Sequence, residues 1–186
     1  MISIIIFLVC FLGGLVLNIC LYSQQMWQIS LIFLFNVILV FAVNGIIAIV
    51  VCKLLPNKWF EGRFFTPTKQ EILFYKHLRI KAWKDRILEL GALNGFRKNH
   101  LSQPTSIEYL QKFILESNKG FLTHFASIFL AILPLFFIPI HYWASLFPPI
   151  ILANFILNFM PMAVLRYNIP RLKVALKFAT RQTKED

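Results

Sequence analysis

The first 51 residues of the chain contain no lysine, arginine, aspartate, glutamate or histidine. Over the whole chain 58% of the residues are hydrophobic, against about 45–50% in soluble domains, so an ordinary soluble fold is excluded. The apolar residues form runs at 2–21 and 29–51, each near the roughly 20 residues that a membrane-spanning helix needs. The first run has no positively charged start and no small-residue cleavage site. We therefore predict two transmembrane helices here rather than a signal peptide.

The chain also lacks the residue patterns of several common enzyme sites. Its two aspartates are Asp85 and Asp186, so it is poorly supplied for metal-dependent or phosphoryl-transfer chemistry, and we predict no metal site. No histidine is followed five positions later by aspartate, which excludes the common phospholipid acyltransferase dyad. A Gly-x-Ser-x-Gly elbow, a His-Glu-x-x-His pair, a Walker loop and a dinucleotide-binding glycine triplet are also absent.

Charge is distributed so unevenly that it predicts a topology. All 19 lysines and arginines lie within 53–119 or 166–184, and two further apolar runs, 121–140 and 146–165, separate these basic stretches. The positive-inside rule places both stretches and both termini in the cytoplasm, which requires an even number of spanning helices. Basic residues next to membrane helix ends bind anionic headgroups, so we do not predict a nucleic-acid partner.

These patterns predict a single all-α domain over residues 1–186, embedded in the cytoplasmic (inner) membrane. It has four transmembrane helices at 2–21, 29–51, 121–140 and 146–165, a cytoplasmic interfacial segment at 53–120 and a tail at 166–186. We expect an amphipathic surface helix over 71–90 and another helix opening at Ser106 and Ile107. We expect Pro170 to break the fourth helix, so that Leu172 to Ala179 form a separate C-terminal surface helix.

His124 stands out because an ionisable group inside an apolar run is costly and tends to face protein or a wet cavity. Two interpretations remain open: a general base or acid, or a neutral imidazole bonded to a carbonyl, to Asn154 or to Asn158. Glu116 precedes His124 by eight residues on the same helix face, too far for a direct bond. His100, close to Lys98, is either a second candidate base or a solvated histidine.

Arg166 and Arg171 follow the fourth run, in the sequence Arg166-Tyr167-Asn168-Ile169-Pro170-Arg171-Leu172. Long cationic side chains at such a position commonly reach for the headgroup region. The alternative is that the two arginines hold an anion such as a phosphate, a carboxylate or a lipid headgroup.

Several separated motifs resemble one known family. The chain is similar, from about Pro56 to Leu172, to bacterial membrane acyltransferases of the glycosyl-4,4'-diaponeurosporenoate acyltransferase type, which act last in staphyloxanthin-type carotenoid synthesis. The matching pieces are Lys58-Trp59-Phe60, Trp83-Lys84-Asp85, Gly91, Phe96 with Lys98 and His100-Leu101, Tyr109-Leu110, Phe113-Ile114, Glu116-Ser117, Lys119-Gly120, Leu122 with His124, Asn158, Arg166-Tyr167-Asn168 and Pro170-Arg171-Leu172.

The resemblance implies transfer of a fatty acyl group from acyl-CoA or acyl-carrier protein to a sugar hydroxyl of a glycolipid or glycosylated isoprenoid. Under it, His124 or His100 deprotonates the hydroxyl and Glu116 orients the histidine or the sugar. Donor binding then belongs to Lys98, Lys119, Arg166 and Arg171, and substrate binding to Asn158, Tyr167, Asn168 and Trp83.

Two other functions fit the same pattern. A non-catalytic lipid-binding scaffold or accessory subunit would use the same basic face, and a lipid transporter would use the intramembrane polar residues. With four spans a transporter would have to oligomerise. No cofactor beyond the acyl donor is expected, and a homo-oligomer is possible.

Overall fold

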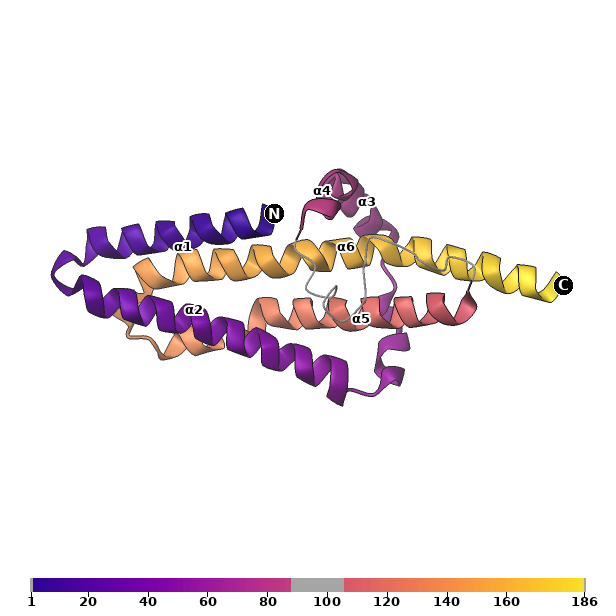
Figure 1. Cartoon of the computed structure of the whole chain (residues 1–186), viewed down its shortest axis with the longest axis horizontal. Helices are drawn as coiled ribbons and strands as arrows, with labels where there is room; N and C mark the ends of the chain where they lie inside the picture. Colours follow the sequence, from indigo (N-terminus) through magenta and orange to yellow (C-terminus); the bar gives the residue numbers. More distant parts are fainter. Residues whose placement is uncertain (1, 88–105, 186) are drawn as a thin grey trace.

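The computed structural model describes residues 2–87 and 106–185, and every regular element within them is helical. Four helices are long and apolar enough to cross a membrane: α1 (Ile2–Leu21), α2 (Met26–Ile49), α5 (Ile107–Leu130) and α6 (Trp143–Glu185). They run side by side along the long axis of the molecule (Figure 1). The prediction of an all-α protein with four membrane-spanning helices is confirmed.

Short elements connect the long helices. α3 (Lys69–His77) and α4 (Ile80–Trp83) lie outside the bundle and next to α6 in Figure 1. A π turn at Val50–Leu54 extends α2. The other helical turns in the described residues are 3-10: Ser23–Gln25, Asn57–Glu61, Arg63–Phe65, Lys84–Arg86, Leu133–Phe137 and Ile140–Tyr142.

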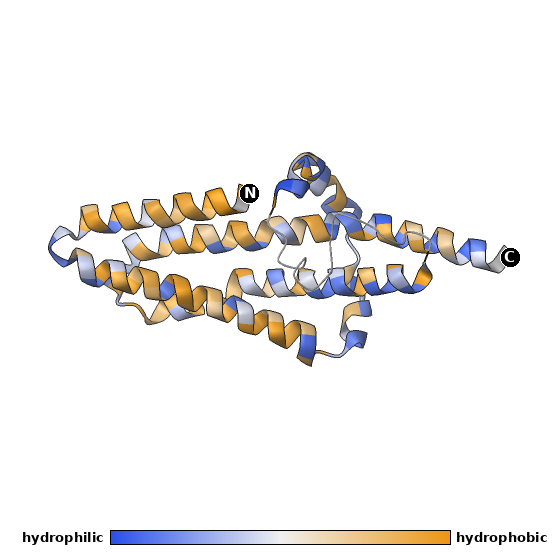
Figure 2. Ribbon diagram, viewed as in Figure 1, coloured by the Kyte–Doolittle hydropathy of each residue, from blue (hydrophilic) through white to orange (hydrophobic). Residues whose placement is uncertain are grey.

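The molecule has an apolar half and a polar half (Figure 2). α1, α2 and the first part of α6 are mainly hydrophobic, whereas α3, α4, the start of α5 and the end of α6 carry many hydrophilic residues. The 43 residues of α6 are about 65 Å long at 1.5 Å per residue, roughly twice the 30 Å hydrocarbon core. The polar half, which we call the basic end, therefore projects beyond the bilayer.

The prediction of a break at Pro170 is wrong. α6 continues without interruption past Pro170 to Glu185, and it also contains Pro148, Pro149 and Pro161. The reason is tertiary packing: Leu172 and Ala179 are buried against residues at the start of α5. The apolar stripe of the tail is present as predicted, but it packs on α5 rather than on the membrane surface. This burial offsets the loss of the backbone hydrogen bond that proline cannot donate.

The single surface helix expected over 71–90 is also wrong within the described residues. The helix ends at His77 and restarts at Ile80, with Arg79 between them in a left-handed conformation (φ 49°). The break lets Tyr75 and Ile80 both pack on α6, in a cluster that includes Val164. Two short helices thus bury apolar surface on both sides of a bend that one straight helix could not follow.

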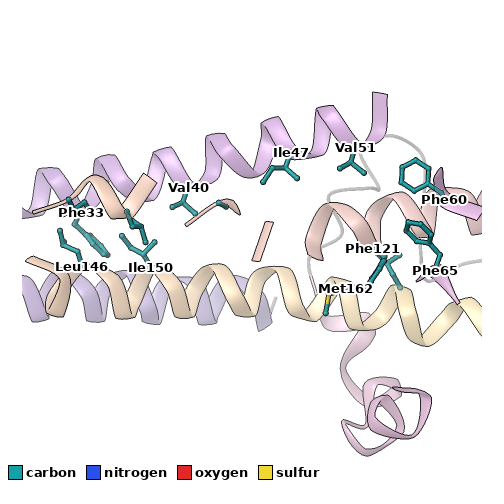
Figure 3. Packing of buried hydrophobic residues seen from close by; sticks show 14 of the residues in the cluster. Phe33, Val40, Ile47, Val51, Phe60, Phe65, Phe121, Leu146, Ile150 and Met162 are labelled. Carbon is teal, nitrogen blue, oxygen red and sulfur yellow. The ribbon is translucent and has the colours of Figure 1, made fainter. Parts of the chain in front are cut away.

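The largest hydrophobic cluster runs along the bundle and links α2, α5 and α6. Figure 3 shows Phe33, Val40 and Ile47 of α2 along the length of the bundle, with Leu146 and Ile150 of α6 near Phe33. Towards the basic end, Phe60 and Phe65 join Phe121 of α5. Side chains from the connecting segment are therefore part of the bundle core.

α1 packs closely on the rest of the bundle at Gly14. A Cβ atom placed on Gly14 would lie 2.6 Å from the ring of Phe33 and 3.0 Å from Pro149, whereas one on Gly13 would meet nothing within 4 Å. We expect Gly14→Leu to cost about 1–3 kcal/mol of stability, since a buried side chain would be forced into occupied space. Gly13→Leu is the matched control and should melt like the wild type when the detergent-solubilised proteins are heated. Equal melting temperatures for both variants would contradict this packing.

Candidate functional site

A hydrogen-bonded network of four polar side chains joins α2, α5 and α6 inside the bundle. His124 Nδ1 lies 3.0 Å from Asn158 Oδ1, and Asn158 Nδ2 donates to Asn154 O at 2.9 Å and to Asn154 Oδ1 at 2.9 Å. Asn44 Nδ2 donates to Asn154 Oδ1 at 3.1 Å, and its own Oδ1 accepts from Asn158 Nδ2 at 3.2 Å. The imidazole is thus hydrogen-bonded to a cluster of three amides that are themselves bonded to one another.

Backbone carbonyls of three helices accept hydrogen bonds from the network, the Asn154 carbonyl of α6 among them. Asn44 Nδ2 also donates to Val40 O at 2.8 Å, and Asn154 Nδ2 donates to Ser127 O at 3.1 Å. Asn154 and Asn158 are 4% and 7% exposed. Polar side chains that bond across helices stabilise membrane bundles, so the network has a structural effect whatever else it does.

An ion pair fixes α3 to α6 at the basic end. Arg166 Nε and Nη2 donate to the two carboxylate oxygens of Glu71 at 2.6 and 2.8 Å, and Nη1 donates to Phe64 O at 2.9 Å. Its guanidinium also lies over the ring of Phe121, 4.3 Å from the centroid. Every nitrogen of this buried arginine therefore donates to a protein oxygen.

Local sequence explains how Glu71 reaches this position. Thr68 caps α3, its hydroxyl accepting from the Glu71 backbone N–H while Glu71 accepts from the Thr68 N–H, a reciprocal capping box. Tyr75, one turn later, donates to Glu71 Oε1 at 3.1 Å. Burial and the neighbouring Glu71 carboxylate raise the pKa of Tyr75 far above its usual range, so the phenol stays protonated and remains a donor.

A second ion pair lies on α5. Lys119 Nζ donates to Glu116 Oε1 at 3.2 Å, and the lysine side chain is 10% exposed against 34% for the glutamate. The preceding residue, Asn118, donates to Phe60 O at 2.8 Å. The expectation that Glu116 and His124 share a helix face without bonding is consistent with this arrangement, because Glu116 is engaged by Lys119.

The other predicted site residues lie on the surface of the basic end. Arg171 donates to the hydroxyl of Tyr167 at 2.6 Å and stacks over its ring, and Asn168 is half-buried beside them. Trp83 donates to Leu78 O at 2.9 Å and packs with Tyr167 in the cluster on α6.

The structure brings some of the predicted residues together and separates others. His124 and Asn158 are in contact, whereas Arg166 and Arg171 have different partners. Lys98 and His100 lie outside the described residues. In the described part of the chain no cluster of three or more His, Cys, Asp or Glu side chains could hold a metal ion.

The sequence reasoning overlooked Asn44 and Glu71. Asn44 carried a usable signal, since it is a polar residue within an uncharged apolar run, where such residues tend to face protein. Glu71 carried none beyond the capping pattern, because its partner Arg166 is 95 residues away.

Comparison with known proteins gives one result. The CrtO family model, described as glycosyl-4,4'-diaponeurosporenoate acyltransferase, matches residues 56–177. No curated protein sequence and no solved structure matches the chain. The matched stretch is more than half of the chain and contains both ion pairs, His124 and Asn158, while Asn44 precedes it. The chain therefore belongs to the CrtO family of glycosyl-4,4'-diaponeurosporenoate acyltransferases and is a membrane acyltransferase of carotenoid glycolipid synthesis.

Proposed function

We propose that this protein transfers a fatty acyl group from acyl-CoA or acyl-carrier protein to a sugar hydroxyl of a glycolipid or glycosylated isoprenoid. One observation carries the choice of site: His124, a general-base residue type, lies within a membrane-spanning helix of the matched region and bonds to Asn158. Its helix leads from the basic end into the apolar half (Figure 2), so an aqueous donor and a lipid acceptor would approach it from opposite ends of the helix.

Orientation follows from charge. The described parts of the two basic stretches lie towards one end of the bundle (Figure 2), and the positive-inside rule places that end, with both termini, on the cytoplasmic side of the cell membrane. Acyl-CoA and acyl-carrier protein are cytoplasmic and anionic, which matches a basic surface at that end.

In the proposed reaction His124 accepts the proton of the sugar hydroxyl as its oxygen attacks the thioester carbonyl carbon. The tetrahedral intermediate then collapses, the carbon–sulfur bond breaks, and the leaving thiolate takes the proton back from the imidazolium. An ester and a free thiol are the products, and the histidine ends in its starting state. Lysine or arginine N–H groups near the carbonyl oxygen stabilise the negative charge that develops there.

The cationic residues of the site differ in their exposure and position, and we assign them different roles. Arg171 is exposed but lies 13 residues, about 20 Å, beyond Asn158 on α6, so we assign it to the donor phosphates. Lys119 is five residues from His124 on α5, and we assign oxyanion binding to it. Lys98 lies outside the described residues and keeps the donor-binding role that the resemblance implies. Tyr167 and Trp83 pack together near Arg171, and with Asn168 they would contact parts of the substrates remote from the reacting atoms. Each side-chain nitrogen of Arg166 already donates to a protein oxygen, and we assign this residue the role of holding α3 against α6.

Lipid profiling of cells that express or lack this protein tests the proposal. Expression should produce an acylated glycolipid or acylated carotenoid glycoside, and deletion should remove it and accumulate the unacylated precursor. The mass difference between precursor and product identifies the acyl chain. If deletion changes no acylated lipid, the transferase proposal fails and a non-catalytic lipid-binding role takes its place.

A further inference from the structure

We propose that Asn44, Asn154 and Asn158 are positioning residues that select one tautomer of the neutral His124 ring, with the proton on Nδ1 rather than on Nε2. This inference deepens the proposed acyl transfer and rests on it for its catalytic meaning. The tautomer itself follows from hydrogen-bond geometry alone. Each step depends on telling the NH2 group of an amide from its oxygen, which the neighbouring backbone carbonyls allow.

The orientation of Asn158 is decided by the carbonyl of Asn154. A backbone carbonyl only accepts, so the Asn158 atom 2.9 Å from it must be the NH2 group. Turning the amide over would bring two oxygens to that distance. The other end of the amide, Oδ1, therefore faces His124 at 3.0 Å.

The same argument fixes the two supporting amides. Asn154 places its NH2 group against Ser127 O and Ile128 O, so its Oδ1 is available to accept from Asn44 and Asn158. Asn44 places its NH2 group against Val40 O, so its Oδ1 accepts from Asn158. All three amides thus have one self-consistent orientation, secured by backbone acceptors on α2, α5 and α6.

The proton on His124 follows from this arrangement. Asn158 Oδ1 carries no hydrogen, so His124 Nδ1 must donate across the 3.0 Å contact. In a neutral imidazole the two ring nitrogens share one proton, and the hydrogen bond of one decides which of them carries it. Whenever the ring is neutral, Nε2 is then the nitrogen without a proton. Positioning of this kind gives a neutral general base the tautomer that the proposed proton transfer needs.

Asn44 extends the candidate site to the N-terminal hairpin. It is on α2, outside the stretch matched by the family model, yet it contacts both amides of α6. The N-terminal hairpin of α1 and α2 therefore contributes a side chain to the candidate site and is more than a membrane anchor.

Nitrogen-15 NMR of the full-length protein, labelled at histidine and held in detergent micelles, tests the tautomer without any need for turnover. Loss of a signal pair in His124→Ala identifies the resonances. At a pH where His124 is neutral, the wild type should show protonated Nδ1 and unprotonated Nε2. Asn158→Leu should move population to the opposite tautomer. Protonated Nε2 in the wild type, or an unchanged spectrum in Asn158→Leu, would overturn the proposal.

Asn36 supplies a matched control. It is also a buried asparagine of α2, but its amide donates to Ile32 O within its own helix. Asn36→Leu should keep both the tautomer and the activity. Asn44→Leu should lower kcat, measured per amount of folded protein, about 100-fold, the scale of loss when a reacting group is displaced by about 1 Å. Equal kcat in the two leucine variants would show that the network is only structural.

The NMR experiment tests the tautomer and the activity assay tests the proposed function, so each can be contradicted without the other. If the wild type shows the expected tautomer but no acyl transfer, the proposed function is wrong and the hydrogen-bond assignment stands. If acyl transfer occurs with protonated Nε2, the assignment is wrong and the function stands.

Discussion

His124→Ala is expected to lower the acyl-transfer rate by about 10²–10⁴-fold, the usual contribution of a positioned general base. Alanine removes the nitrogen that accepts the hydroxyl proton, while the cationic side chains at the basic end remain. The rate should be measured in inverted membrane vesicles supplied with labelled acyl-CoA and the extracted acceptor lipid, at matched amounts of protein. Because binding of the donor is unaffected, the loss should fall on kcat rather than on KM.

His77→Ala is the matched control for this experiment. His77 is exposed at the end of α3, also at the basic end, so its removal should leave the rate unchanged. Loss of the His124–Asn158 bond is no reason for unfolding, since a hydrogen bond between membrane helices contributes about 0.6 kcal/mol on average. Full activity of His124→Ala would transfer the role of base to His100.

The helices could be predicted because their determinants are local. Length of apolar run and placement of charge decide where a helix can enter lipid, and α1 and α2 follow from them closely. Ser106 was recognised as the start of α5, and its hydroxyl accepts from the backbone N–H of Tyr109.

The predictions that the structure contradicts concern features that depend on contacts between distant segments. Proline usually ends a helix, but α6 continues past Pro170 because α5 buries the following turns of α6. The expected surface helix bends at Arg79 because α6 offers burial for the residues on both sides. In each case the local pattern was real and the packing partner, invisible in a linear sequence, decided the outcome.

In the candidate site, too, local features could be predicted from the sequence and contacts between distant helices could not. A bond between His124 and Asn158 was one of two interpretations that the sequence left open, and the structure contains it. The roles of these residues stay a prediction. That Asn44 completes the network requires knowing that α2 crosses α5 and α6 at this level, which residue types and spacing do not determine.

Glu71→Gln is expected to destabilise the protein by about 3–5 kcal/mol, the cost of removing one partner from a buried ion pair. Glutamine keeps the size of the side chain but removes the charge, and it leaves the Arg166 guanidinium, 7% exposed, without a counter-charge. The effect should appear as a lower melting temperature of the detergent-solubilised protein. Arg166→Leu should cost less, because the carboxylate of Glu71 is 23% exposed and is partly hydrated when left alone.

The double variant Glu71→Gln with Arg166→Leu should be more stable than the sum of the two losses predicts, since neither charge is then left buried alone. Asp85→Asn is the control on an exposed pair: Asp85 lies 3.8 Å from Lys84 and is 66% exposed, so its loss should change stability by less than about 1 kcal/mol. Additive losses in the double variant would mean that Glu71 and Arg166 act independently. A coupled loss would instead establish that one ion pair holds the α3 segment on α6, the helix that carries Asn158.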